Sequence, residues 1–151
     1  MATYTGTSGT DTLTGGSRSD TIHGLDGSDT LSGGGSGDLL YGGNNSDIAY
    51  GGDGSDRIYG EAGEDSLYGE SGRDTMDGGA DDDTLWGGSD NDTLYGDDGA
   101  DGIAGGDDES EVAVLVSGHL HHVEAGGALP VFDRQVELVG QHEVAEGRAG
   151  G

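Results

Sequence analysis

The chain has 151 residues, of which 30% are hydrophobic and 35 are glycine, and this composition argues against an ordinary packed globular core. It has no cysteine, which excludes disulfides and thiolate metal sites. Its 31 acidic residues and only 5 Lys and Arg give a net charge of -26, which would repel nucleic acids and anionic membrane surfaces. The composition therefore favours cations as partners.

Residues 1–5 are expected to be a short lead-in. The segment from Met1 to Thr14 has no basic start followed by an apolar run, and no run of 18 apolar residues occurs in the sequence. We therefore expect no cleaved export signal and no membrane-spanning helix. Low hydrophobicity with high net charge is also typical of disorder, so the periodicity of the chain has to decide between folded and disordered.

From Gly6 to Ala104 the sequence divides into eleven units of nine residues, without insertion or deletion. Position one of every unit is Gly, and position eight is aliphatic or Met except for the smaller Ala49. Position six of every unit is aspartate: Asp11, Asp20, Asp29, Asp38, Asp47, Asp56, Asp65, Asp74, Asp83, Asp92 and Asp101. A fixed period of this kind predicts a solenoid.

The last three residues of a unit, such as Thr93 to Tyr95, alternate outward, inward and outward, as a short strand requires. The first six residues are then expected to form the turn. A positive φ angle suits Gly at position one, and it also suits the Gly, Asn or Asp found at most fourth positions. Arg18 and Ser36 are the exceptions at position four. Two units make one coil, so units n and n+2 are expected to stack in an all-β parallel solenoid.

Such stacking places the sixth-position carboxylates in columns about 4.8 Å apart, where they repel one another unless a cation lies between them. Ca²⁺ accepts six to eight oxygen ligands in a forgiving geometry, whereas Mg²⁺ demands a tighter octahedron. Turn carbonyls are the expected additional ligands. The candidate carbonyls belong to Gly9, Gly27, Gly52, Gly54, Gly63, Gly72 and Gly99.

These nonads resemble the RTX, or haemolysin-type, calcium-binding repeat with the pattern GGxGxDxUx. Gly51 to Asp56, reading GGDGSD, is the best match, and a degenerate twelfth unit at 105–113 has Ser110 in place of Asp. The resemblance implies a right-handed parallel β-roll over residues 6–113, in which the sixth-position aspartates bind Ca²⁺.

Some units depart from the RTX pattern. Position four carries Arg18, Ser36 or Asn45 in three of them, and position two carries Glu61 or Glu70 in two others. Sites built from these turns are expected to be weaker or empty.

The metal-free chain is expected to be unfolded, because its Gly-rich backbone loses much conformational entropy on folding and only one side chain per nonad is buried. If each ion bridges units n and n+2, roughly nine Ca²⁺ ions bind per chain and offset most of the negative charge. Extracellular modules commonly bind Ca²⁺ with dissociation constants of about 10⁻⁴ to 10⁻³ M. These properties favour a secreted, extracellular folding module, and the resemblance implies type I export with an uncleaved C-terminal signal.

Position nine is often aromatic. Tyr50, Tyr68 and Trp86 are expected in one column, with Tyr41 and Tyr59 on the opposite face. The rings either stack between coils and stabilise the solenoid, or form an adhesive, glycan-binding surface.

Position seven is often threonine, which also suggests an ice-binding array. Leu39, Ile48 and Arg57 interrupt it. The β-propensity of threonine is the simpler explanation.

Residues 114–151 have a different composition and are expected to form a capping or disordered tail. The apolar run from Val112 to Val116 could add a last strand over the open end of the solenoid. A cluster of His119, His121 and His122 near Glu124 raises the alternative of a transition-metal site. An altered reading frame is another explanation of the change in composition.

No HExxH or GxSxG motif occurs in the sequence, so we expect no enzymatic activity. A remaining alternative is that the chain is the noncatalytic repeat part of a secreted protease, lipase or toxin.

Overall fold

The computed structural model describes residues 1–106 and 122–124, and the regular secondary structure in these two ranges consists of strands. The short strands are β1 (Thr3–Thr5), β2 (Thr12–Thr14) and β13 (His122–Glu124). The longer strands are β3 (Thr21–Asp26), β4 (Thr30–Gly35), β5 (Leu39–Asn44), β6 (Ile48–Asp53), β7 (Arg57–Ala62), β8 (Ser66–Ser71), β9 (Thr75–Ala80), β10 (Thr84–Ser89), β11 (Thr93–Asp98) and β12 (Gly102–Gly106).

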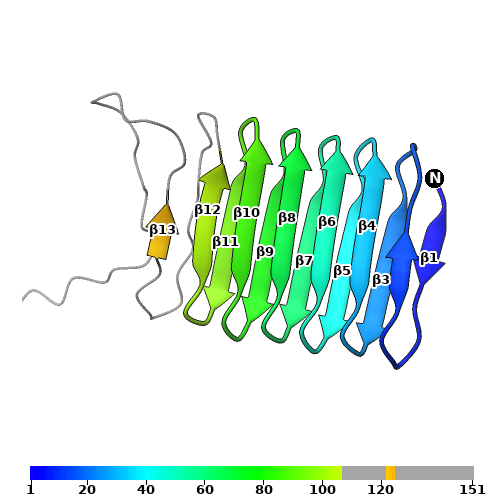
Figure 1. Cartoon of the computed structure of the whole chain (residues 1–151), viewed down its shortest axis with the longest axis horizontal. Coiled ribbons are helices and arrows are strands. Elements are labelled where there is room, and N and C mark those ends of the chain that lie inside the picture. Colours follow the sequence, from blue (N-terminus) through cyan, green and yellow to red (C-terminus); the bar gives the residue numbers. More distant parts are fainter. Residues whose placement is uncertain (107–121, 125–151) are drawn as a thin grey trace, which may run out of the picture.

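The strands alternate between two parallel sheets that run along the long axis of the molecule (Figure 1). The odd sheet has six strands in the order β1-β3-β5-β7-β9-β11. The even sheet has seven, in the order β13-β12-β10-β8-β6-β4-β2. Residues two units apart face each other, as Leu40 faces Ile58 and Leu31 faces Ala49. The predicted right-handed β-solenoid of two-nonad coils is therefore confirmed.

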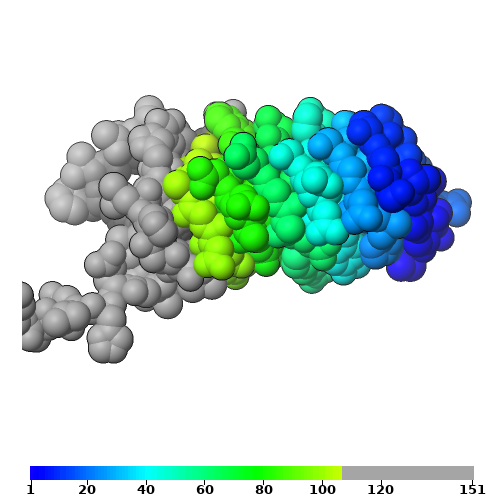
Figure 2. All heavy atoms as spheres, turned by 90° about the horizontal axis from the view of Figure 1, so that it is seen from below, coloured from blue at the N-terminus to red at the C-terminus, as the bar shows by residue number. Residues whose placement is uncertain are grey.

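The core consists of the position-eight side chains, which both sheets contribute to the space between them. These residues are 0 to 2% exposed, and Tyr4 and Leu13 of the first coil pack against them. The buried members are Ile22, Leu31, Leu40, Ala49, Ile58, Leu67, Met76, Leu85, Leu94 and Ile103. The space-filling view shows how slender the resulting rod is (Figure 2).

The prediction of three-residue strands is wrong, because the strands of the central coils have six residues. Each strand continues from positions seven to nine through positions one to three of the next unit. Its burial alternates, with positions eight and one inward and positions seven and nine outward. Because Gly at position one faces the interior without a side chain, the strand continues where the sequence was expected to turn.

The prediction of a positive φ at position one is also wrong. Positive φ angles occur at positions two and four, as at Gly52 (106°) and Ser36 (72°). Position one needs glycine because the next coil is too close. A Cβ atom on Gly42 would lie 2.6 Å from Asp47 Oδ2 and 2.7 Å from the carbonyl oxygen of Gly60. The positive φ predicted at position four is confirmed for most units.

Both ends of the repeat carry additional strands. At the N-terminal end, β1 pairs with β3, so residues expected as a lead-in occupy a strand position of the first coil. At the other end, β13 pairs with β12, with Val123 facing Ile103. The strand expected at Val112 to Val116 lies outside the described residues.

The side chains of the His119, His121, His122 and Glu124 cluster also lie outside the described part of the structure. Within the described ranges, no helix is long and apolar enough to cross a membrane.

Candidate metal sites

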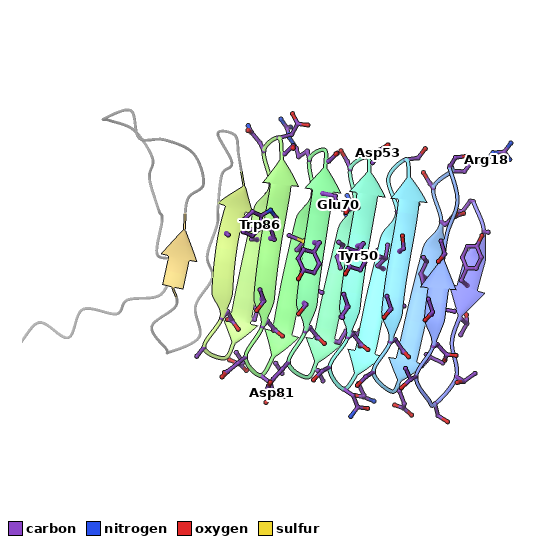
Figure 3. All side chains as sticks on the ribbon, in the orientation of Figure 1. Arg18, Tyr50, Asp53, Glu70, Asp81 and Trp86 are labelled. Atoms are coloured by element: carbon purple, nitrogen blue, oxygen red, sulfur yellow. The ribbon has the colours of Figure 1, made fainter. Side chains whose placement is uncertain are left out.

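The sixth-position aspartates lie at the turns, where the chain passes from one sheet to the other. From the second unit onward their side chains are 0 to 5% exposed. Aspartates of odd-numbered units line one row of turns and those of even-numbered units line the other. Figure 3 shows the turns at the two opposite ends of the strands, marked by the labels of Asp53 and Asp81, which lie near these turns but are not sixth-position residues. The predicted columns of carboxylates are therefore present.

From the third unit onward, one oxygen of each sixth-position carboxylate links consecutive coils. The backbone N–H of Asp38 donates to Asp56 Oδ1 at 2.7 Å, and that of Asp56 donates to Asp74 Oδ1 at 2.8 Å. Nine such bonds between aspartates, 2.7 to 3.0 Å long, connect units n and n+2. Sequence reasoning missed this role, because a residue type at a fixed spacing does not indicate which oxygen bonds to the backbone.

The second oxygen points toward the first residues of its own unit. In the first two units Oδ2 accepts a hydrogen bond from the backbone. The N–H of Thr7 donates to Asp11 Oδ2 at 2.6 Å, and the N–H of Gly16 donates to Asp20 Oδ2 at 3.0 Å. In later units buried Oδ2 atoms make no hydrogen bond. They belong to Asp29, Asp38, Asp47, Asp56, Asp65, Asp74, Asp83 and Asp92. Since a buried polar atom without a partner is costly, these atoms fit a bound cation.

Burial raises the pKa of Asp56 to about 6 and the pKa of Asp65, Asp74 and Asp83 to about 7. The negative charge of the aspartate two units earlier raises the pKa further, while the hydrogen bond from that residue's backbone opposes the shift. The charged form is therefore disfavoured in the protein alone, and a nearby cation would favour it.

The candidate carbonyl ligands occupy two positions of the repeat. Gly52 is at position two, and the others, Gly9, Gly27, Gly54, Gly63, Gly72 and Gly99, are at position four. Position-four residues of consecutive coils are in close contact. A Cβ atom on Gly54 would lie 2.7 Å from the Ser36 carbonyl oxygen, and one on Gly27 would lie 2.9 Å from the Gly9 carbonyl oxygen. The carbonyl groups at position four thus lie at the boundary between consecutive coils, beside the next turn of the same row.

No group of three or more His, Cys, Asp or Glu side chains in residues 1–106 and 122–124 is arranged to hold a metal ion. A cation bound at the turns would therefore take at most two side-chain carboxylates. Its remaining ligands would be backbone carbonyls and water. This donor set suits Ca²⁺, which accepts many oxygen ligands in flexible geometry, better than Zn²⁺, which prefers nitrogen and sulfur.

The predicted aromatic columns are confirmed by the strand register. Tyr50, Tyr68 and Trp86 are aligned on the even sheet, and Tyr41 and Tyr59 on the odd sheet. The rings of Tyr41 and Tyr59 stack at 5.1 Å, and His23, which sequence reasoning did not include, stacks on Tyr41 at 4.8 Å. Ring stacking between coils is therefore a structural role of these columns.

Comparison with known families agrees with this architecture. The RTX calcium-binding nonapeptide repeat (4 copies) matches residues 5–40, 41–76 and 77–109, which is well over half of the chain. No curated protein matches the chain. The matched segments coincide with the stacked coils and their buried aspartates. The chain therefore belongs to the RTX calcium-binding nonapeptide repeat family, whose repeats bind calcium in a β-roll.

Proposed function

We propose that this chain is a Ca²⁺-dependent folding module of a secreted protein, unfolded in the cytosol and folded in the extracellular medium. The observation that carries the proposal is the set of buried, unbonded Oδ2 atoms at the turns. Without a cation, folding buries carboxylates whose charged form is disfavoured. With Ca²⁺ bound, the same carboxylates stabilise the folded state.

The proposed ligands are the Oδ2 atoms of the sixth-position aspartates, Asp11 to Asp101, and turn carbonyls such as those of Gly54 and Gly72. The Oδ1 atoms remain hydrogen-bonded to the preceding coil. An ion between each linked pair of aspartates gives roughly nine ions, one for each of the nine Asp-to-Asp links. Turns with Arg18 at position four, or with Glu61 or Glu70 at position two, are proposed as the weaker sites.

Folding is then tied to location. Dissociation constants of about 10⁻⁴ to 10⁻³ M leave such sites empty at cytosolic Ca²⁺ and filled outside the cell. RTX repeat proteins are typically secreted, and an unfolded chain suits passage through a type I export channel. The repeat is a noncatalytic structure, so a protease, lipase or toxin activity would come from a separate domain.

The test is a Ca²⁺ titration of metal-stripped protein followed by far-UV circular dichroism, with Mg²⁺ as the matched control and calorimetry for the ion count. We expect a cooperative transition from coil to β-structure that Ca²⁺ produces and Mg²⁺ does not, with several ions bound per chain. A chain that is fully folded in chelator would contradict the proposal, as would one that stays unfolded at saturating Ca²⁺.

A further inference from the structure

The outer surface of the even sheet has a distinct composition. At positions seven, nine and two of β4, β6, β8 and β10 the outward-facing residues are hydroxyl, aromatic, aliphatic and glycine residues, and Glu70 is the only charged side chain among them. The exposed Asp53 at the end of β6 lies at the border of this surface, next to the turn. We call this surface the uncharged face. Its residues are Thr30, Ser32, Gly34, Ile48, Tyr50, Gly52, Ser66, Tyr68, Glu70, Thr84, Trp86 and Gly88. In a chain with a net charge of -26, such a surface needs an explanation.

The odd sheet provides the comparison. Its column of Tyr41 and Tyr59 matches that of the even sheet in register and ring stacking. The outward positions beside this column, however, include Arg57, Glu61 and Asp77. Stacking between coils therefore explains both aromatic columns. It does not explain why the face around the even-sheet column has so few charged side chains.

The aromatic column of the uncharged face leaves ring surface accessible. Tyr50 and Tyr68 stack at 5.1 Å with their planes 13° apart, and Trp86 follows them in register. Small side chains, Ser32 and Ala104, flank the column at its two ends. Trp86 is 49% exposed, so a large aromatic ring is accessible on this face. Figure 3 labels Tyr50, Glu70 and Trp86 along this face.

Hydroxyl groups lie beside the rings. Ser66 and Thr84 occupy position seven of the strands that carry Tyr68 and Trp86 at position nine. Aromatic rings provide flat apolar contact, and hydroxyls both donate and accept hydrogen bonds. A ligand suited to this surface is uncharged, extended and rich in hydroxyl groups. An anionic ligand would be repelled by the acidic turns that border the face on both sides.

We propose that the uncharged face binds a neutral polysaccharide, with Trp86 as the stacking residue and the outer edges of the Tyr50 and Tyr68 rings extending the apolar contact. The surface is flat and repeats along the solenoid. It therefore suits a long polysaccharide chain better than a small molecule. A second copy of this chain is a poorer occupant, because two molecules of net charge -26 repel each other. The inference requires the folded solenoid but does not depend on how Ca²⁺ controls its folding.

The test uses the full chain in saturating Ca²⁺, with circular dichroism to verify folding of each variant. Native affinity electrophoresis in gels containing hydroxyethyl cellulose, dextran or galactomannan measures binding to neutral chains, and carboxymethyl cellulose is the anionic control. Trp86 is the only tryptophan, so its fluorescence reports contact at the proposed site directly. We expect retardation by at least one neutral polysaccharide, a change in Trp86 emission, and no retardation by carboxymethyl cellulose.

Variants separate binding from stability. Trp86→Ala removes a stacking ring, and Thr84→Asp adds a charge at an exposed position without removing a ring; each should weaken binding about tenfold or more. Tyr59→Ala, the matched variant on the odd sheet, should bind like the natural chain. The proposal is overturned if no neutral polysaccharide binds, if Tyr59→Ala weakens binding as much as Trp86→Ala, or if the face is instead buried in a dimer of this chain.

Discussion

Replacing Asp65 by asparagine is expected to have opposite effects with and without Ca²⁺. Asp65 is 2% exposed, its Oδ1 accepts the Asp47 N–H at 2.7 Å, and its Oδ2 makes no hydrogen bond. Asparagine keeps an oxygen for the Asp47 N–H and removes the charge. In chelator the variant should therefore fold more readily, because the pKa of Asp65 is raised to about 7 by burial and by neighbouring negative charges.

In Ca²⁺ the sign reverses, because a ligand is lost. A site at ten times its dissociation constant stabilises the folded state by about 1.4 kcal/mol. Asp65 borders two gaps between coils, since it is linked to Asp47 on one side and to Asp83 on the other. The expected loss of stability in Ca²⁺ is therefore about 1.4 to 2.8 kcal/mol.

Two unfolding experiments measure these effects. Folding driven by trimethylamine N-oxide in chelator gives the metal-free stability, and urea unfolding in Ca²⁺ gives the metal-bound stability. The control is Glu64→Gln, which removes the same charge from an exposed position of the same unit, and Glu64 is not among the charges that raise the pKa of Asp65. The expectation is refuted if Asp65→Asn destabilises the metal-free fold, or if its stability in Ca²⁺ equals that of Glu64→Gln.

Three further predictions concern pH, packing and surface charge. Folding raises the pKa of four aspartates from 3.8 to about 6 or 7, namely Asp47, Asp56, Asp65 and Asp74. Protonating them therefore stabilises the folded state. This stabilisation is fully present below about pH 4 and is lost as the pH rises through 6 to 7. Circular dichroism in chelator should therefore show more β-structure at about pH 4 than at about pH 7, and the opposite trend would contradict the cited shifts. Gly42→Ala, which places a Cβ atom 2.7 Å from the Gly60 carbonyl oxygen, should destabilise the Ca²⁺-bound fold by about 1 to 3 kcal/mol in urea unfolding. Gly35→Ala, whose Cβ would meet Ser17 at an ordinary 3.7 Å, should be tolerated, and equal losses for the two variants would be the contrary result. Asp77 lies outside the turn rows and is repelled by Asp97. Asp77→Asn should therefore stabilise the protein against urea at neutral pH without shifting the midpoint of the Ca²⁺ titration. A shifted midpoint would place Asp77 in a metal site.

The period of nine residues predicted much of the fold. It established which residues stack, so the registers of Leu40 with Ile58 and of Tyr50 with Tyr68 follow from counting along the chain. It also predicted the two columns of aspartates. Position within a strict repeat is equivalent to position in space, because each coil adds the same translation.

The roles of the glycines were harder to predict, because two different features of the backbone favour glycine. At Gly42 the φ angle is not positive and the cause is the close approach of the next coil, whereas Gly52 combines a positive φ angle with a close approach to the Gly34 carbonyl oxygen. Glu61 and Glu70 were interpreted as departures that weaken metal sites, and they adopt the same positive φ as glycines at position two. A sequence shows that a small residue is present, whereas the reason for it depends on distances between coils.

The two oxygens of each buried carboxylate explain why position six is aspartate rather than asparagine. An asparagine would supply the Oδ1 acceptor that links Asp47 to Asp65, without burying a charge. The chain nevertheless repeats aspartate at all eleven sixth positions, at the cost of raised pKa values and unbonded Oδ2 atoms. A solenoid that had only to fold would gain from the neutral residue. Retaining the charge would make folding depend on a cation, as the proposed Ca²⁺-controlled folding requires.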